Sequence, residues 1–287
     1  MRDYVIITDS GSDLDAAFAG ELGIRVLDLT VIKDGEAPIA DSKMDIKGFY
    51  NFLRENKMAT TSAVNVEAFE EAMEQIIAED KDILYLGFSS GLSSTYNAGR
   101  LAAEEMAQKY PDRKILAADT LCASLGQGLL VYLAVQKKNE GATIEEVKAW
   151  VEEKKLNLCH WFTVDDLMFL KRGGRVSATT AVVGTMLSIK PVMHVDNEGH
   201  LVKVGTARGR RASIDAMFDK MKATAIDPAS QSVFICHGDC VEDANYLADK
   251  IKSELLVKEV YIGYTGAVIG SHSGPGTLAL FYLGTER

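Results

Sequence analysis

The first half of the chain alternates short apolar runs with longer helix-periodic segments, and this alternation limits the fold more than any other feature. The short runs are typical of buried strands and lie at residues 4–7, 25–32, 83–86 and 114–118. The helix-periodic segments lie at residues 14–22, 46–56, 66–79, 96–106, 125–137 and 143–157. Strands that alternate with helices predict an α/β fold, with helices flanking a mostly parallel sheet.

The pattern changes near residue 158. Strand-like runs then lie at residues 161–164, 201–204, 232–236 and 260–263, with helix-like segments at 212–222 and 241–254. We therefore predict two α/β domains, an N-terminal domain over residues 1–157 and a C-terminal mixed α/β domain over residues 158–287. A ligand site is expected in the cleft between them.

Composition limits the partners and the compartment. The 287 residues carry a net charge of −10, which argues against nucleic acid as a main partner because phosphate binding needs a basic face. The chain starts with a strand-like run instead of a signal segment, and no apolar run approaches the length of a membrane span. Its four cysteines are scattered along the sequence, which suits a reducing environment. A cytoplasmic, soluble protein is expected, and no motif predicts a metal or another cofactor.

A polar turn at residues 88–96 follows one apolar run and precedes a helix-like segment. It overlaps Gly87-x-Ser89-x-Gly91, the pattern of the nucleophile elbow of serine hydrolases, and His272 follows later in the chain, as that class requires. Hydrolase elbows place the helix directly after the serine, whereas four residues separate Ser89 from the expected helix here. A serine hydrolase that uses Ser89 and His272 therefore stays as an alternative.

The same turn also suits an anion. Ser93 and Ser94 offer hydroxyls at an expected helix start, where unpaired backbone N–H groups and the helix dipole favour a negative charge. The simpler interpretation is that both serines cap the helix. Thr61 and Ser62 stand just before another expected helix and have the same two interpretations. His272 is expected in a sharply turned loop, whose glycines would let a bound group come close.

Two basic clusters stand out in this acidic chain, Lys171-Arg-Gly-Gly-Arg175 and Arg208-Gly-Arg-Arg211. An isolated cluster of this kind is usually a solvated loop, but two in one predicted domain favour a docking surface for phosphate or an acidic partner. A binder of sugar phosphates or nucleotide phosphates is a third interpretation.

Six motifs in register give the chain a specific resemblance. They are Asp9-Ser-x-Ser-Asp-Leu14, Thr61-Ser62, Ser90-Gly-Leu-Ser-x-Thr-Tyr96, Leu170-Lys-Arg-Gly-Gly-Arg175, Ser188-Ile-Lys-Pro191 and His272-x-Gly-Pro-Gly276. In this order they resemble the DegV family over residues 5–282. The resemblance implies a two-domain α/β protein of bacteria that binds a long-chain fatty acid in a buried tunnel.

The resemblance also implies the roles of individual residues. It assigns the fatty-acid carboxylate to a group of polar side chains: Thr61, Ser93 and His272, with Ser62 and Ser94 beside them. A non-catalytic protein of this kind serves as the acyl-presenting subunit of a fatty-acid kinase, whose separate ATP-dependent subunit phosphorylates the carboxylate. Arg172 and Arg175 would help to present the head group to that subunit, and transient contact with a membrane surface is compatible with the role.

Overall fold

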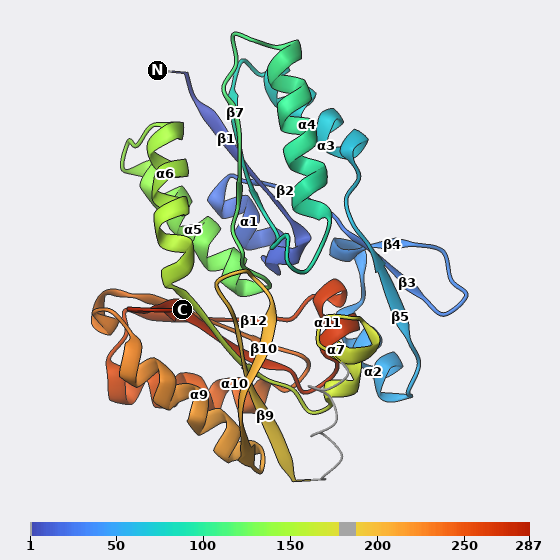
Figure 1. Cartoon of the computed structure of the whole chain (residues 1–287), viewed down its shortest axis with the longest axis vertical. Helices are drawn as coiled ribbons and strands as arrows, with labels where there is room; N and C mark the ends of the chain where they lie inside the picture. The colour runs from blue at the N-terminus through green and yellow to red at the C-terminus, as the bar shows by residue number, and fades with distance from the viewer. Residues whose placement is uncertain (1, 178–187) are drawn as a thin grey trace.

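Figure 1 shows a computed structural model of the chain, which describes residues 2–177 and 188–287. Its strands are β1 (Tyr4–Asp9), β2 (Arg25–Leu27), β3 (Thr30–Lys33), β4 (Ile39–Ala40), β5 (Ala59–Ser62), β6 (Asp82–Gly87), β7 (Ile115–Asp119), β8 (Leu158–Thr163), β9 (Ile189–Val195), β10 (Leu201–Arg208), β11 (Ser232–His237), β12 (Glu259–Tyr264) and β13 (Leu278–Leu283).

The α-helices are α1 (Ala16–Leu22), α2 (Ile46–Arg54), α3 (Val66–Ala78), α4 (Thr95–Lys109), α5 (Leu125–Asn139), α6 (Ile144–Lys154), α7 (Leu167–Arg172), α9 (Arg210–Thr224), α10 (Val241–Leu255) and α11 (Ala267–Ser273). Short 3-10 helices are η1 (Ser10–Ser12), η2 (Asp41–Lys43), η3 (Lys155–Asn157) and η5 (Pro228–Ser230). In Figure 1 the α-helices surround the strands, and the two large sheets lie one above the other.

A parallel sheet with the strand order β2-β1-β6-β7 forms the centre of the first half of the chain. Alternate side chains of β6 enter different cores: Leu84 and Leu86 pack with α5 and α6, whereas Ile83 and Tyr85 pack with α3 and α4. Because helices cover both faces, the strands are nearly continuous apolar runs. The predicted strands at residues 4–7, 83–86 and 114–118 are confirmed as parts of β1, β6 and β7.

A small antiparallel sheet with the order β4-β3-β5 lies beside the parallel one. The prediction of a single strand at residues 25–32 was wrong, because this run is divided into β2 and β3, which belong to different sheets. The chain turns between them where the Ser10 hydroxyl accepts the Leu29 N–H at 3.0 Å. Strand β5, which the sequence pattern did not predict, pairs Thr61 with Val31 of β3.

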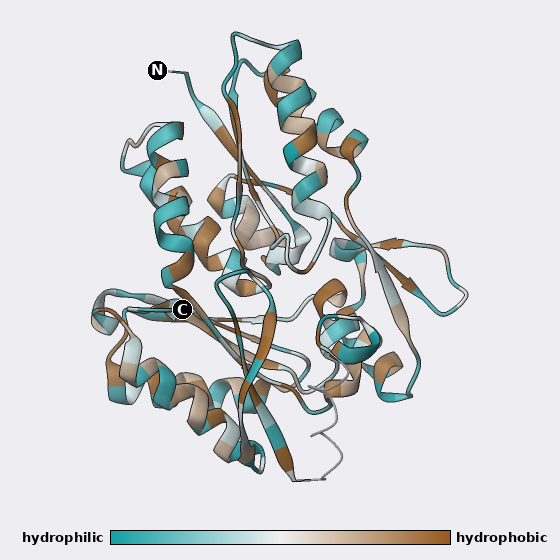
Figure 2. Ribbon diagram, viewed as in Figure 1, coloured by the Kyte–Doolittle hydropathy of each residue, from teal (hydrophilic) through white to brown (hydrophobic). Residues whose placement is uncertain are grey.

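The second half of the chain forms a mixed sheet with the order β10-β9-β8-β13-β11-β12. Strands β11 and β12 are parallel, and the other neighbours are antiparallel. Helices α9 and α10 cover one face of this sheet through a core of its own. The opposite face presents Phe162, Cys236, Ala279 and Phe281 to a core shared with α5. Figure 2 shows that the strands of both large sheets are rich in apolar residues, whereas the outer helices also carry hydrophilic ones.

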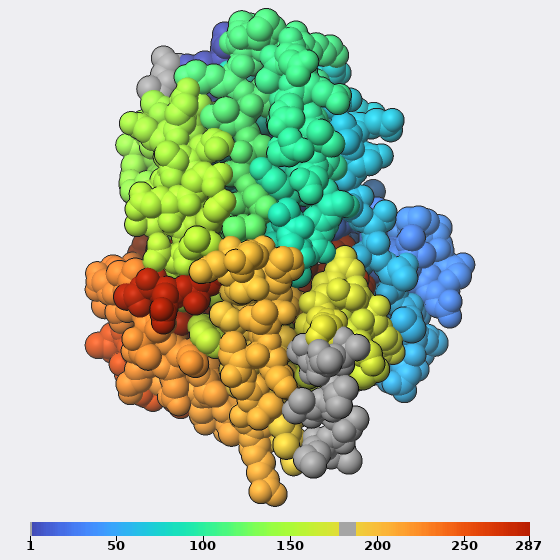
Figure 3. Space-filling model, viewed as in Figure 1, coloured from blue at the N-terminus to red at the C-terminus, as the bar shows by residue number. Residues whose placement is uncertain are grey.

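This architecture confirms the predicted fold class, a parallel sheet flanked by helices followed by a mixed α/β region. The domain boundary at residue 157 stays a prediction. Helix α11, from the second half, packs against α2, β3 and β5 of the first half, and Figure 3 shows the two halves in broad contact. Within residues 2–177 and 188–287, no helix is long and apolar enough to cross a membrane.

Candidate functional site

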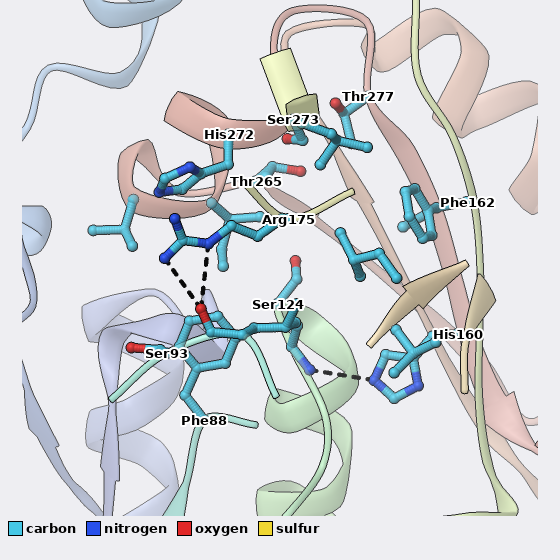
Figure 4. A pocket seen from close by; sticks show the side chains of 18 of the residues that line it. Phe88, Ser93, Ser124, His160, Phe162, Arg175, Thr265, His272, Ser273 and Thr277 are labelled. Carbon is cyan, nitrogen blue, oxygen red and sulfur yellow. Dashed lines mark hydrogen bonds between the residues drawn. The ribbon is translucent and has the colours of Figure 1, made fainter. Parts of the chain in front are cut away.

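A cavity of about 200 Å³ lies between the inner face of the six-stranded sheet and the first half of the chain. Both halves contribute its apolar lining, which consists of Leu29, Ala63, Phe88, Leu92, Ala123, Phe162, Leu170, Val195, Leu201, Val268, Ile269, Ala279 and Phe281. Several polar side chains line the same space, and Figure 4 shows some of them around it. We call this space the main cavity.

Thr61 of β5 and His272 of α11 meet at the main cavity, where Thr61 Oγ1 lies 2.8 Å from His272 Nε2. The prediction of a loop at His272 was wrong, because His272 lies in the last turn of α11. The helix ends at Ser273 and is capped by Gly274, which has a φ of 79°. Burial, together with the nearby Arg175 guanidinium, lowers the pKa of His272 to about 4. The imidazole is therefore neutral at pH 7.

Neutral His272 sets the direction of the Thr61 hydroxyl. His272 Nδ1 is buried and has no hydrogen-bond partner among the described residues. Because a buried N–H without a partner is rarer than a buried acceptor without one, we assign the proton to Nε2. Nε2–H then donates to Thr61 Oγ1, and the Thr61 hydroxyl can donate its own proton to a ligand.

The lowered pKa of His272 predicts a specific pH dependence of stability. Unfolded His272 takes up a proton as the pH falls through 6.5, whereas folded His272 stays neutral until about 4. The free energy of unfolding should therefore fall between pH 6.5 and pH 4, by about 2 to 3 kcal/mol from this group, and be unaffected by it above pH 6.5. Urea unfolding of the wild type and of His272→Gln across this range checks the prediction, since parallel curves for the two proteins would contradict it.

Ser93 lies in the turn between β6 and α4. Its Oγ accepts the Thr95 N–H at 3.2 Å and lies 2.9 Å from Thr95 Oγ1. Ser94 occupies the N-cap position of α4 but makes no side-chain capping bond, and it is exposed at the rim of the main cavity. The buried carboxylate of Asp9 holds the start of this turn by accepting the Phe88 N–H at 2.9 Å.

Ser89 lacks the contacts of a hydrolase nucleophile. Its side chain is completely buried, its hydroxyl donates to the Gly199 carbonyl at 2.9 Å, and it accepts the Gly91 N–H at 3.2 Å. A nucleophilic serine needs a hydrogen bond to its histidine base, and within the described part of the chain His272 Nε2 contacts Thr61 instead. The geometry therefore gives the hydrolase alternative no support.

Arg175 lies inside the site instead of on an outer surface. Its guanidinium donates twice to the Leu92 carbonyl, at 3.1 and 3.3 Å, and once to the Gly173 carbonyl. Figure 4 shows it between His272 and Ser93. Burial lowers the pKa of Arg175, but a guanidinium remains charged at neutral pH. Arg175 therefore places a positive charge beside the polar end of the main cavity.

A second cavity, of about 240 Å³, shares Thr61, Arg175 and His272 with the main cavity. It extends to Arg172 in the last turn of α7, which is exposed and holds its guanidinium 4.7 Å from the centre of the Phe169 ring. The two arginines thus differ: Arg175 lines both cavities, and Arg172 lines the second one only. The Thr61–His272 pair stands where the two cavities adjoin.

The structure brings four of the five candidate carboxylate ligands to the main cavity, namely Thr61, Ser93, Ser94 and His272. Ser62 is exposed and, as the next residue of β5, points to the other side of the strand.

Sequence reasoning missed the remaining polar lining: Ser124, His160, Cys236, Thr265, Ser273 and Thr277. No motif marks these residues, and only the strand register and helix packing reveal them. Among the described residues, no three His, Cys, Asp or Glu side chains are grouped to hold a metal ion.

A family model described as "Uncharacterised protein, DegV family" matches residues 3–285. The chain belongs to the DegV family. A DegV domain-containing protein of Clostridium perfringens is 48% identical over 289 residues, which cover 100% of this chain and 99% of that relative. The resemblance inferred from the six motifs is thereby confirmed.

Solved structures of DegV proteins share the fold. A DegV lipid-binding protein from Thermotoga maritima is 29% identical, with a TM-score of 0.88 and 99% of each chain covered. A DegV family protein from Thermus thermophilus, whose structure is described as showing fatty-acid binding, is 32% identical, with a TM-score of 0.87 over 99% of this chain and 100% of that one.

Proposed function

We propose that this DegV protein binds one long-chain fatty acid, with its hydrocarbon in the main cavity and its carboxylate at Thr61, Ser93 and His272. The observation that carries the proposal is the Thr61–His272 contact at the place where a largely apolar cavity adjoins a second cavity lined by two arginines. The lipid-binding and fatty-acid-binding DegV structures from Thermotoga maritima and Thermus thermophilus support this ligand class.

A carboxylate that leaves water for this site needs hydrogen-bond donors there. The Thr61 hydroxyl, directed by neutral His272, supplies one. Ser93 Oγ already accepts the Thr95 N–H, so its own proton can be donated to the carboxylate. The Arg175 guanidinium adds a nearby positive charge without leaving its carbonyl partners. Hydrogen bonds to a charged group are about twice as strong as neutral ones, which suits a head group that must be held in place.

The hydrocarbon supplies most of the gross binding energy. Burial of about fifteen methylenes contributes roughly 12 kcal/mol at about 0.8 kcal/mol each. Association and ordering cost roughly 4–15 kcal/mol, so the chain alone leaves little net affinity. The hydrogen bonds to the carboxylate therefore decide whether the ligand is retained.

The second cavity gives the bound carboxylate a polar side from which a reaction partner can approach. We propose that a separate ATP-dependent subunit acts there. A carboxylate oxygen attacks the γ-phosphorus of ATP, the bond to the ADP oxygen breaks, and an acyl phosphate forms. This chain would hold and present the acid without performing catalysis alone, and Arg172 would contact the phosphoryl group or the partner.

Arg172→Ala is expected to slow acyl-phosphate formation about 10- to 100-fold, because it removes one charge-assisted hydrogen bond. The affinity for the fatty acid should stay unchanged. Hydroxylamine trapping with the ATP-dependent subunit of a bacterial fatty-acid kinase measures the rate, and titration with stearate measures the affinity. Lys171→Ala is the control, because Lys171 is the exposed neighbour on the same helix. An equal loss in both assays, or no loss in either, would contradict the role of Arg172.

Mass spectrometry of an organic extract from the purified, unsupplemented protein tests the central proposal. A near-stoichiometric long-chain fatty acid is expected. Labelling by a fluorophosphonate probe is not expected, because the Ser89 hydroxyl is buried and bonded to a carbonyl. An extract without lipid from protein that also fails to bind added stearate would refute the proposed function.

A further inference from the structure

Ser273 carries a buried hydroxyl in the wall of the main cavity. It is 5% exposed, and its Oγ makes no hydrogen bond within the described residues. In the view of Figure 4 it lies between His272 and Thr277. Ser271, two residues earlier in α11, donates to the Ala267 carbonyl at 2.7 Å, which is the ordinary bond of a helical serine. Ser273 does not make the corresponding bond.

The remaining hydroxyls of this part of the wall donate to protein atoms: Thr277 to the Gly274 carbonyl at 2.8 Å, Thr265 to the Cys236 thiol at 3.1 Å, and Ser124 to the Asp13 carboxylate. They therefore face the cavity as acceptors. Ser273 differs from these hydroxyls, because its proton is available to a ligand in the cavity. A plain hydrocarbon would leave this hydroxyl unpaired, and buried polar groups in native proteins nearly always have a partner.

We propose that the cavity takes acyl chains with a hydroxyl group near the carboxyl end, at carbon 2 or carbon 3, and that Ser273 binds this hydroxyl. The inference rests on the proposed fatty-acid function and narrows its substrate class. The position follows from the order of the polar side chains, because Ser273 directly follows His272 in α11 and Figure 4 shows it beside His272 on the side of Thr277. With the carboxylate at His272, Ser273 reaches the first carbons beyond it. A serine hydroxyl both donates and accepts, so it pairs with a ligand hydroxyl in either direction.

The test compares stearate with 2-, 3- and 12-hydroxystearate on lipid-stripped protein by titration calorimetry. The wild type is expected to bind the 2- or 3-hydroxy acid about 3- to 10-fold more tightly than stearate, because one buried hydrogen bond contributes an amount of this size. Ser273→Ala should abolish this preference and leave stearate binding in place. Ser271→Ala is the matched control, since it removes the same atoms from the same helix, and it should keep the preference.

Each outcome has one meaning. The preference is the ratio of the dissociation constants of two ligands for the same protein, so a general loss of stability affects both constants and cancels in their ratio. A wild type that binds none of the acids would refute the proposed function. A wild type that binds stearate without preferring the 2- or 3-hydroxy acid would overturn this inference alone, as would a preference that survives Ser273→Ala. If Ser273→Ala weakened stearate and the hydroxy acids equally, Ser273 would contact the carboxylate, and the inference would also be overturned.

Discussion

Ser93→Ala combined with His272→Ala is expected to release the fatty acid while the chain stays folded. The double variant removes one donor to the carboxylate and the group that directs another, the Thr61 hydroxyl. A hydrogen bond to a charged group contributes about 1.5–3 kcal/mol, so two lost bonds weaken binding about 10²- to 10⁴-fold. The hydrocarbon cannot compensate, because its burial is largely offset by the cost of association.

The measurement is the amount of fatty acid extracted from the purified variant, together with its dissociation constant for stearate. Ser90→Ala combined with His200→Ala is the matched control, since it makes the same changes at two exposed residues. Circular dichroism and urea unfolding establish that both proteins are folded. Retention of fatty acid by the folded Ser93/His272 variant at the wild-type level would exclude these residues as its carboxylate site.

The parallel sheet could be predicted from the sequence because strands buried on both faces are continuous apolar runs. β6 and the turn after it illustrate this, since six buried residues end at Gly87 and lead into the start of α4. Helix starts were also readable where a side chain caps its own helix. Asn65 accepts the Ala68 N–H at 2.9 Å, and Thr143 forms a capping box with Glu146.

The elements that carry Thr61 and His272 of the proposed carboxylate site could not be predicted, because contacts distant in sequence stabilise them. Helix α11 is seven residues long and contains a glycine in its middle. The Asp41 carboxylate accepts the Val268 N–H at 3.1 Å at its start, and the Tyr50 hydroxyl donates to the Thr265 carbonyl at 2.7 Å just before it. Strand β5 similarly exists only through its pairing with β3. Local propensity is too weak to predict either element: α11 contains Gly270, and the two threonines of β5 favour a strand only slightly.

The residues of the cavity wall could not be predicted from the sequence either, because an apolar residue that lines a ligand resembles one that fills a core. Ala279 shows what the structure adds. It lies between Phe162 of β8 and Cys236 of β11 in the sheet register, and all three side chains line the main cavity. A small residue between larger neighbours leaves space at the surface of the sheet. This position is where the length of the acyl chain can be tested.

Ala279→Phe is therefore expected to exclude long acyl chains while leaving the head-group site intact. A benzyl group in a cavity of about 200 Å³ occupies space that several methylenes need. Exclusion of about four methylenes removes roughly 3 kcal/mol, or about 100-fold in affinity for an eighteen-carbon acid. A ten-carbon acid should lose much less, so the ratio of the two dissociation constants should shift by about 100-fold toward the shorter acid. Titration with decanoate and stearate measures both affinities.

Ala37→Phe is the control, because it adds the same ring at an exposed position between β3 and β4. Stability separates cavity filling from damage to the fold. A ring that fills existing space leaves the free energy of unfolding of the lipid-free protein unchanged or higher, whereas overpacking lowers it by about 1–3 kcal/mol. If the variant remained stable and bound stearate as tightly as the wild type, the hydrocarbon would have to lie elsewhere, and the main cavity would lose its assignment as the acyl site.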